Sequence, residues 1–181
     1  AHLPLVVNEK RSKLSKRRGA QPLTYYRDQG YLPEAILNFL TLVGWNPGTE
    51  QEIFTKKELV KLFDLARVQK SAGFFNIEKL NWVNKEHIKR LSIDAQCDYV
   101  EQFLPGEVKA LTGYSHEMLL RVTPVIIDYI THFGEVTEQG ERGEINYFFK
   151  DPTYVKEALF WKSDLDFAHT KEKLDKVVEL L

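Results

Sequence analysis

Apolar residues recur at helical spacing along much of this 181-residue chain, and that periodicity limits its fold more than any other feature. In the stretch 33–44, Ile36, Phe39, Leu40 and Val43 lie at spacings of i, i+3, i+4 and i+7, and so share one helix face. Pro33 suits the first turn of a helix and Gly44 suits its end. The pattern therefore predicts a helix over residues 33–44.

Polar capping residues predict where further helices begin. The expected starts are Thr55 with a capping box to Glu58, Asn76 with a short turn holding Lys79 and Leu80, Ser92, Ser115, Thr153 and Thr170. A stripe of inward-facing residues follows Ser115: Leu119, Val122, Ile126, Tyr129, Ile130 and Phe133. Pro124 lies inside this stripe and should kink or split the helix. We expect a mainly α fold with a few short strands in the first half.

Composition excludes several classes of protein. No apolar run approaches the roughly 20 residues that span a membrane. The five histidines show no metal-ligand spacing, so we expect no metal site. One cysteine, Cys97, excludes an internal disulfide and suits a reducing compartment, the cytoplasm or an organellar matrix. Because Cys97 shares a helical stripe with Ile93, Val100 and Leu104, we expect a buried and inert thiol.

Charge divides the chain into two halves. Residues 1–91 contain 16 Lys and Arg against 9 Asp and Glu, whereas residues 92–181 contain 9 against 17. Phosphate contacts supply much of the affinity for nucleic acid, so a nucleic-acid surface should lie mainly in the first half. We therefore expect two domains, 1–91 and 92–181, that meet near Ser92.

Two clusters could carry chemistry. The run Lys13-Leu14-Ser15-Lys16-Arg17 follows an extended apolar segment, so it could form a basic loop that closes over a polyphosphate. The alternatives are a solvated basic loop or a nuclear-localisation-like run. Lys79 and Trp82 are three residues apart and share a helix face, where the ring could stack on a base or sugar while the ammonium holds phosphate. A core role for Trp82 is equally open.

These segments together resemble glutamyl-tRNA synthetases, a family of class I aminoacyl-tRNA synthetases. The basic run resembles the KMSKS signature of the family, with Leu14 in place of Met and Arg17 in place of the final Ser. The other matching segments are 2–6, 25–40, 42–45, 52–55 and 75–84. The resemblance covers roughly the first ninety residues, and after Ser92 only the helical pattern continues it.

The resemblance implies roles for individual residues. The loop closes over ATP, with Lys13, Ser15, Lys16 and Arg17 at ATP-binding positions. Lys16 is the implied catalytic residue, because its ammonium can stabilise the charge that develops as pyrophosphate leaves. The resemblance implies that Lys79, Trp82 and Lys89 contact the tRNA. The family often uses an arginine against the third anticodon base, but Tyr129 lies near that position here, which leaves the anticodon preference open.

The resemblance also implies a parent enzyme. We expect the chain to be a C-terminal fragment holding the KMSKS loop, the stem-contact region and a helical anticodon-binding domain. The parent would join glutamate to tRNA(Glu) through glutamyl-adenylate, with ATP and magnesium. No HIGH-type motif occurs, so we expect the fragment to be inactive and to need no cofactor.

Further expectations concern the binding partners, the oligomeric state and the location of the protein. We expect tRNA(Glu) as the partner, with tRNA(Gln) as an open alternative, and a cytoplasmic monomer with no membrane contact. Glutaminyl-tRNA synthetases are disfavoured because they carry β-barrels where residues 92–181 look helical. The alternative function is a non-catalytic helical module that binds RNA or protein and whose basic loop only grips phosphate.

Overall fold

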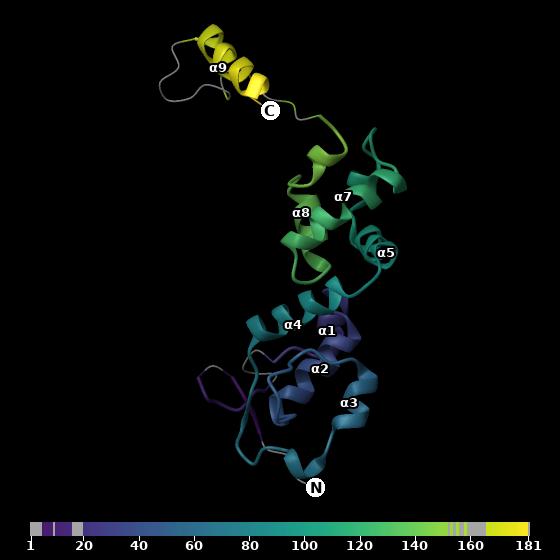
Figure 1. Ribbon diagram of the computed structural model, residues 1–181, viewed down its shortest axis with the longest axis vertical. Helices are drawn as coiled ribbons and strands as arrows, with labels where there is room; N and C mark the ends of the chain where they lie inside the picture. The colour runs from purple at the N-terminus through teal and green to yellow at the C-terminus, as the bar shows by residue number, and fades with distance from the viewer. Residues whose placement is uncertain are drawn as a thin grey trace.

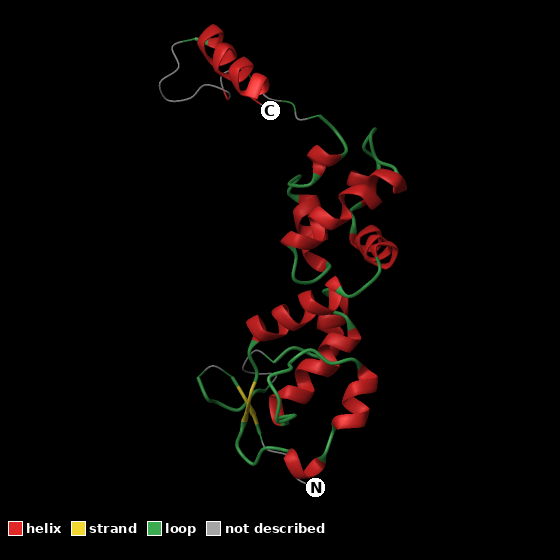
Figure 2. Cartoon of the chain, viewed as in Figure 1, coloured by secondary structure: helices red, strands yellow, loops and turns green. Residues whose placement is uncertain are grey.

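A computed structural model describes residues 5–8, 10–15, 20–151, 153, 155, 158 and 166–180. Within these ranges the chain is mainly helical, with two short strands, as predicted (Figure 2). The elements are β1 (Val6–Val7), α1 (Leu23–Asp28), α2 (Pro33–Gly44), α3 (Lys56–Leu62), η2 (Leu65–Arg67), β2 (Gly73–Phe74), α4 (Ile77–Lys89), α5 (Ile93–Phe103), α6 (Gly106–Lys109), α7 (His116–Tyr129), α8 (Gly134–Glu141), η3 (Asn146–Phe148) and α9 (Phe167–Leu180).

The elements follow one another along an elongated molecule (Figure 1). Helices α1 to α4 and the strands lie at one end, α5, α7 and α8 lie in the middle, and α9 lies apart at the other end. Strand β1 pairs in parallel with β2, with Val6 opposite Gly73 and Val7 opposite Phe74. Helix α2 packs on α4, and α5 packs on α7.

Capping side chains begin four helices at the predicted places. Thr55 and Glu58 form the full capping box, in which Glu58 Oε2 accepts from the Thr55 N–H at 2.7 Å. Asn76, Ser92 and Ser115 each accept a hydrogen bond from the N–H three residues later. These bonds satisfy backbone donors that have no partner inside the helix.

One predicted helix was too short, and one predicted helix start was wrong. Asn76 begins a helix of 13 residues and not a short turn, because Leu80, Val83 and Ile88 are buried along its length. Helix α9 begins at Phe167, before Thr170, since Asp166 Oδ1 accepts from the His169 N–H at 2.9 Å. The helix expected from Thr153 falls largely outside the described residues.

Helix α7 continues through Pro124 without splitting. Pro124 has no backbone N–H to donate within the helix. In the same turn, the Thr123 hydroxyl donates to the Leu119 carbonyl at 2.8 Å. The predicted inward stripe holds except at Tyr129, which is 75% exposed. The helix ends there and the backbone is extended at Ile130, so helical periodicity no longer decides which residues face the core.

One continuous hydrophobic cluster crosses the region of Ser92. It joins buried residues of α2 and α4, such as Phe39 and Leu80, to buried residues of α5 and α7, such as Val100 and Ile126. Cys97 lies fully buried in this cluster, and burial raises the pKa of its thiol. The prediction of a buried thiol is therefore confirmed, since a raised pKa disfavours the thiolate.

Two glycines allow close backbone contact across this region. Gly30 has a φ of +74°, and its carbonyl accepts from the Phe133 N–H at 3.3 Å. The Gly134 N–H donates to the Gln29 carbonyl at 3.0 Å. A Cβ atom on Gly30 would lie 2.8 Å from that of Phe133, so no larger residue fits without movement.

Asn84 of α4 forms hydrogen bonds to the backbone on both sides of the contact between residues 29–30 and 133–134. It is fully buried, its Oδ1 accepts from the Leu32 N–H at 2.9 Å, and its Nδ2 donates to the Thr131 carbonyl at 2.6 Å. Nearby, Lys85 Nζ donates to the Asp128 carbonyl at 2.6 Å. Helix α4 therefore holds the segment after α7 against the first half of the chain.

His87 makes stability sensitive to pH. It is 8% exposed, its Nε2 lies 3.0 Å from Asn38 Oδ1, and burial, assisted by the Arg90 charge, lowers its pKa from 6.5. A lowered pKa means that the unfolded chain binds the proton more tightly, so the folded state loses stability as pH falls below about 6.5. We expect urea unfolding to show this loss between pH 7.5 and 5.5, and a smaller loss in His87→Gln. Equal losses in the two proteins would contradict this assignment.

Candidate functional site

A tight turn leads into the basic run. Val7 and Lys13 form an antiparallel bridge, which brings the two arms of the turn together. Between them, Asn8 Oδ1 accepts from the Lys10 N–H at 3.1 Å and from the Ser12 N–H at 3.1 Å and hydroxyl at 2.9 Å. Arg11 has a φ of 54°, a left-handed conformation that is uncommon outside glycine. One asparagine side chain thus shapes the turn before the predicted ATP loop.

The ends of the predicted ATP loop are held by backbone hydrogen bonds. The Leu14 N–H donates to the Val6 carbonyl at 2.9 Å, and the Ala20 N–H donates to the Ser15 carbonyl at 3.1 Å. Lys13 is exposed and Ser15 is partly buried. These bonds fix where the loop leaves the fold and where it returns.

The predicted catalytic residue Lys16 and its neighbour Arg17 lie outside the described residues. Their assignment therefore stays a prediction, based on the motif and on its anchored ends.

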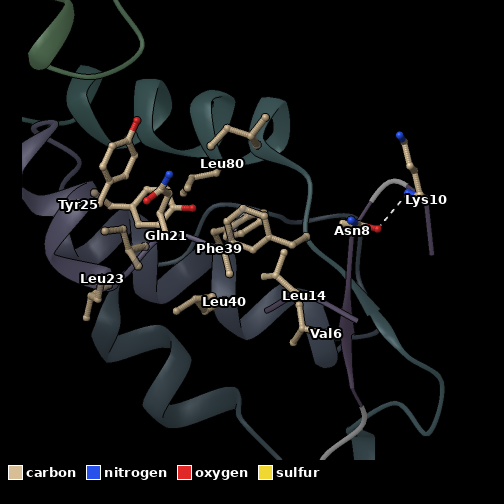
Figure 3. Close-up of a pocket in the computed structure, with 15 residues that line it drawn as sticks. Val6, Asn8, Lys10, Leu14, Gln21, Leu23, Tyr25, Phe39, Leu40 and Leu80 are labelled. Atoms are coloured by element: carbon tan, nitrogen blue, oxygen red, sulfur yellow. Dashed lines mark hydrogen bonds between the residues drawn. The ribbon is translucent and has the colours of Figure 1, made fainter. Parts of the chain in front are cut away.

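Below the basic run lies a mainly apolar cavity of about 670 Å³ (Figure 3). Val6 and Leu14 line it from the loop side, and Phe39 and Leu40 of α2 line it from the helix side. Leu14 occupies the position where the family signature carries Met. The described start of the loop therefore rests on apolar contacts through Leu14, while Lys13 is exposed.

The second cluster lies at the start of α4. Lys79 Nζ is 2.5 Å from Glu52 Oε2 and 4.1 Å from the centre of the Trp82 ring. Trp82 is 40% exposed, so the alternative of a core tryptophan is wrong. A cation above an indole ring is a favourable contact, worth about 0.5–1 kcal/mol at an exposed site. The structure thus places Lys79 and Trp82 together on the surface.

The other lysines of α4 lie farther along it. Lys89 pairs with Glu86 at 3.1 Å and remains exposed. It lies ten residues after Lys79, about 15 Å along a helix with a rise of 1.5 Å per residue. The structure therefore separates the predicted tRNA contacts into a Lys79–Trp82 pair and a second cation.

Sequence inspection missed Glu52. It lies 27 residues before Lys79, in the segment between α2 and α3, and no local pattern connects the two. Its backbone carbonyl accepts from Nδ2 of the buried Asn38 at 3.0 Å, and the Phe54 N–H donates to Asn38 Oδ1 at 2.8 Å. Asn38 therefore fixes the position of Glu52.

Neither a metal site nor a membrane span is found among the described residues. No three His, Cys, Asp or Glu side chains in those ranges come together as metal ligands. No described helix is long and apolar enough to cross a bilayer.

Similarity to known proteins first indicates the class of enzyme to which the first part of the chain is related. A family profile for the catalytic domain of class I tRNA synthetases (E and Q) matches residues 1–82, the part that holds the basic run and the start of α4. No strand occurs among the described residues after Ser92, which agrees with a helical second half. Residues 1–82 therefore match the class I synthetases for glutamate and glutamine.

The relatives specify the family further. Glutamate–tRNA ligase of Desulforamulus reducens is 38% identical over 87% of this chain, and that of Carboxydothermus hydrogenoformans is 33% identical over 99%. These matches cover 32% and 38% of the relatives, so the chain spans about a third of their length. A solved glutamate tRNA ligase from Elizabethkingia meningosepticum, in complex with its amino acid, matches all of this chain and 38% of its own, with a TM-score of 0.74 and 26% identity. The chain is thus homologous to one segment of the glutamate–tRNA ligases.

Proposed function

We propose that this chain is the tRNA-contacting part of a glutamate–tRNA ligase, which joins glutamate to tRNA(Glu) through glutamyl-adenylate. The observation that carries the proposal is the exposed Trp82 ring with the Lys79 ammonium above it, on the basic half of a homologue of these ligases. An aromatic face and an adjacent cation suit a base or ribose next to its phosphate.

The two halves would contact successive regions of the RNA. Residues 1–91 would hold the ATP loop and contact the stem, with Lys79 and Lys89 on phosphates and Trp82 on a ring. Residues 92–181 would reach toward the anticodon, where the exposed Tyr129 offers a further aromatic surface. The elongated arrangement of the helices supports contacts spread along the RNA (Figure 1). We propose a cytoplasmic monomer, with tRNA(Gln) as the open alternative partner.

The basic run would serve ATP. Lys13, Ser15 and Arg17 would bind and position the phosphates, and the Lys16 ammonium would stabilise the pyrophosphate as it leaves. The anchored loop ends at Leu14 and Ala20 support this proposal, because a loop that closes over a ligand needs fixed attachment points.

We expect Lys79→Gln and Lys89→Gln together to weaken tRNA binding and to flatten its dependence on salt. Each lost phosphate contact should reduce the log–log salt slope by somewhat under ~1 unit. Fluorescence anisotropy with labelled tRNA(Glu) at two salt concentrations measures both quantities. Lys109→Gln together with Lys150→Gln, two exposed lysines of the acidic half, makes the same charge change and is the matched control. If the double variant keeps its affinity and slope, the tRNA docks elsewhere.

A further inference from the structure

Glu52 occupies the place where an RNA phosphate would be expected. Its carboxylate lies 2.5 Å from Lys79 Nζ, the ammonium that also sits above the Trp82 ring. An incoming phosphate would therefore compete with this carboxylate for the Lys79 ammonium. We propose that Glu52 is a positioning residue, an internal competitor that holds Lys79 over Trp82 in the free protein and releases it to an RNA phosphate.

The position of Glu52 does not depend on the ion pair. Buried Asn38 holds the Glu52 backbone, and the next two residues, Ile53 and Phe54, are 8% and 1% exposed. The carboxylate thus projects from a rigid base, beside the first turn of α4. A fixed carboxylate can order the flexible lysine stem, which would otherwise sample many rotamers.

The pair is also weak enough to open. The Lys79 and Glu52 side chains are 37% and 47% exposed, and ion pairs between exposed groups contribute about 0.2–1 kcal/mol. A phosphate bound to Lys79, together with a ring stacked on Trp82, offers more than this pair supplies. A lone anion offers only the charge. The competitor therefore favours RNA that presents a phosphate and a ring together.

This inference rests on the proposed RNA contact of Lys79, and a double-mutant cycle tests the two separately. Glu52→Gln keeps the side-chain size and the backbone bond to Asn38 but removes the competing charge. We expect tRNA(Glu) affinity to rise about 1.4- to 5-fold, the range that corresponds to an exposed ion pair. The log–log salt slope should also become steeper, because the released Glu52 carboxylate no longer takes up a cation on binding.

The matched control is Glu50→Gln, which makes the same charge change two residues earlier on an exposed side chain. Lys79→Gln should weaken binding and reduce the effect of Glu52→Gln to that of the control. If Lys79→Gln weakens binding but Glu52→Gln only equals Glu50→Gln, the role of Glu52 is overturned and the RNA contact stands. If Lys79→Gln changes nothing, both are overturned. Thermal unfolding of each variant confirms that the fold is kept.

Discussion

Replacing Lys16 by alanine in the full-length parent is expected to slow adenylate formation by about 10²–10³-fold, a loss of about 2.7–4 kcal/mol of transition-state stabilisation. The size is taken by analogy with the removal of one oxyanion-hole donor. The ammonium would act mainly on charge that develops as pyrophosphate leaves, so glutamate binding should change far less. Pyrophosphate exchange measures the rate, and glutamate titration measures the binding.

The control for this variant is Lys10→Ala, which removes an exposed cation of the preceding turn while keeping its backbone bond to Asn8. We expect the control to retain most of the exchange rate. An unchanged rate in Lys16→Ala would show that the basic run is only a solvated loop. The non-catalytic alternative would then gain support.

Replacing Gly30 by alanine is expected to destabilise the chain strongly. The left-handed backbone at this position costs a residue with a Cβ about 1–2 kcal/mol, and overpacking against Phe133 adds about 1–3 kcal/mol. The carbonyls of Gly30 and Gln29 accept bonds from residues 133 and 134, so the contact between the two halves should loosen first. Urea unfolding measures the change in free energy.

Two other glycines separate these causes. Gly48 has a φ of +76° but only the Arg67 side chain within 4 Å of a Cβ, at 3.8 Å, so Gly48→Ala should show the backbone cost alone. Gly44 has neither a positive φ nor a neighbour within 4 Å, so Gly44→Ala should change stability little. A loss in Gly30→Ala no larger than in Gly48→Ala would contradict the role of close packing at the contact between the halves.

Local signals predicted most of the helices correctly because a cap and an apolar stripe act within a few residues. The capping box at Thr55 and the caps at Ser92 and Ser115 depend only on side chains that reach the next turn. The same reasoning was wrong at Tyr129, where the end of α7 removes the periodicity on which it relied. It also made the Asn76 helix too short, since burial against α2 extends α4.

The candidate site was predictable only in part. Spacing placed Lys79 and Trp82 on one face, but it could not decide whether Trp82 was buried, because exposure depends on what packs against α4. The pairing of Lys79 with Glu52 joins residues far apart in sequence, and Asn38 of a third segment sets its geometry. Long-range contacts of this kind leave no local pattern in one sequence.

Aminoacylation by the full-length parent tests the central claim most directly. Purified parent protein would be supplied with ATP, radiolabelled glutamate, and either tRNA(Glu) or tRNA(Gln), with radiolabelled glutamine as the control amino acid. The proposed function predicts that glutamate is joined to tRNA(Glu), while glutamine is joined to neither tRNA. Charging of tRNA(Gln) with glutamate as well would show the broader anticodon preference left open at Tyr129. Failure to charge either tRNA with glutamate, by a folded protein, would contradict the proposal.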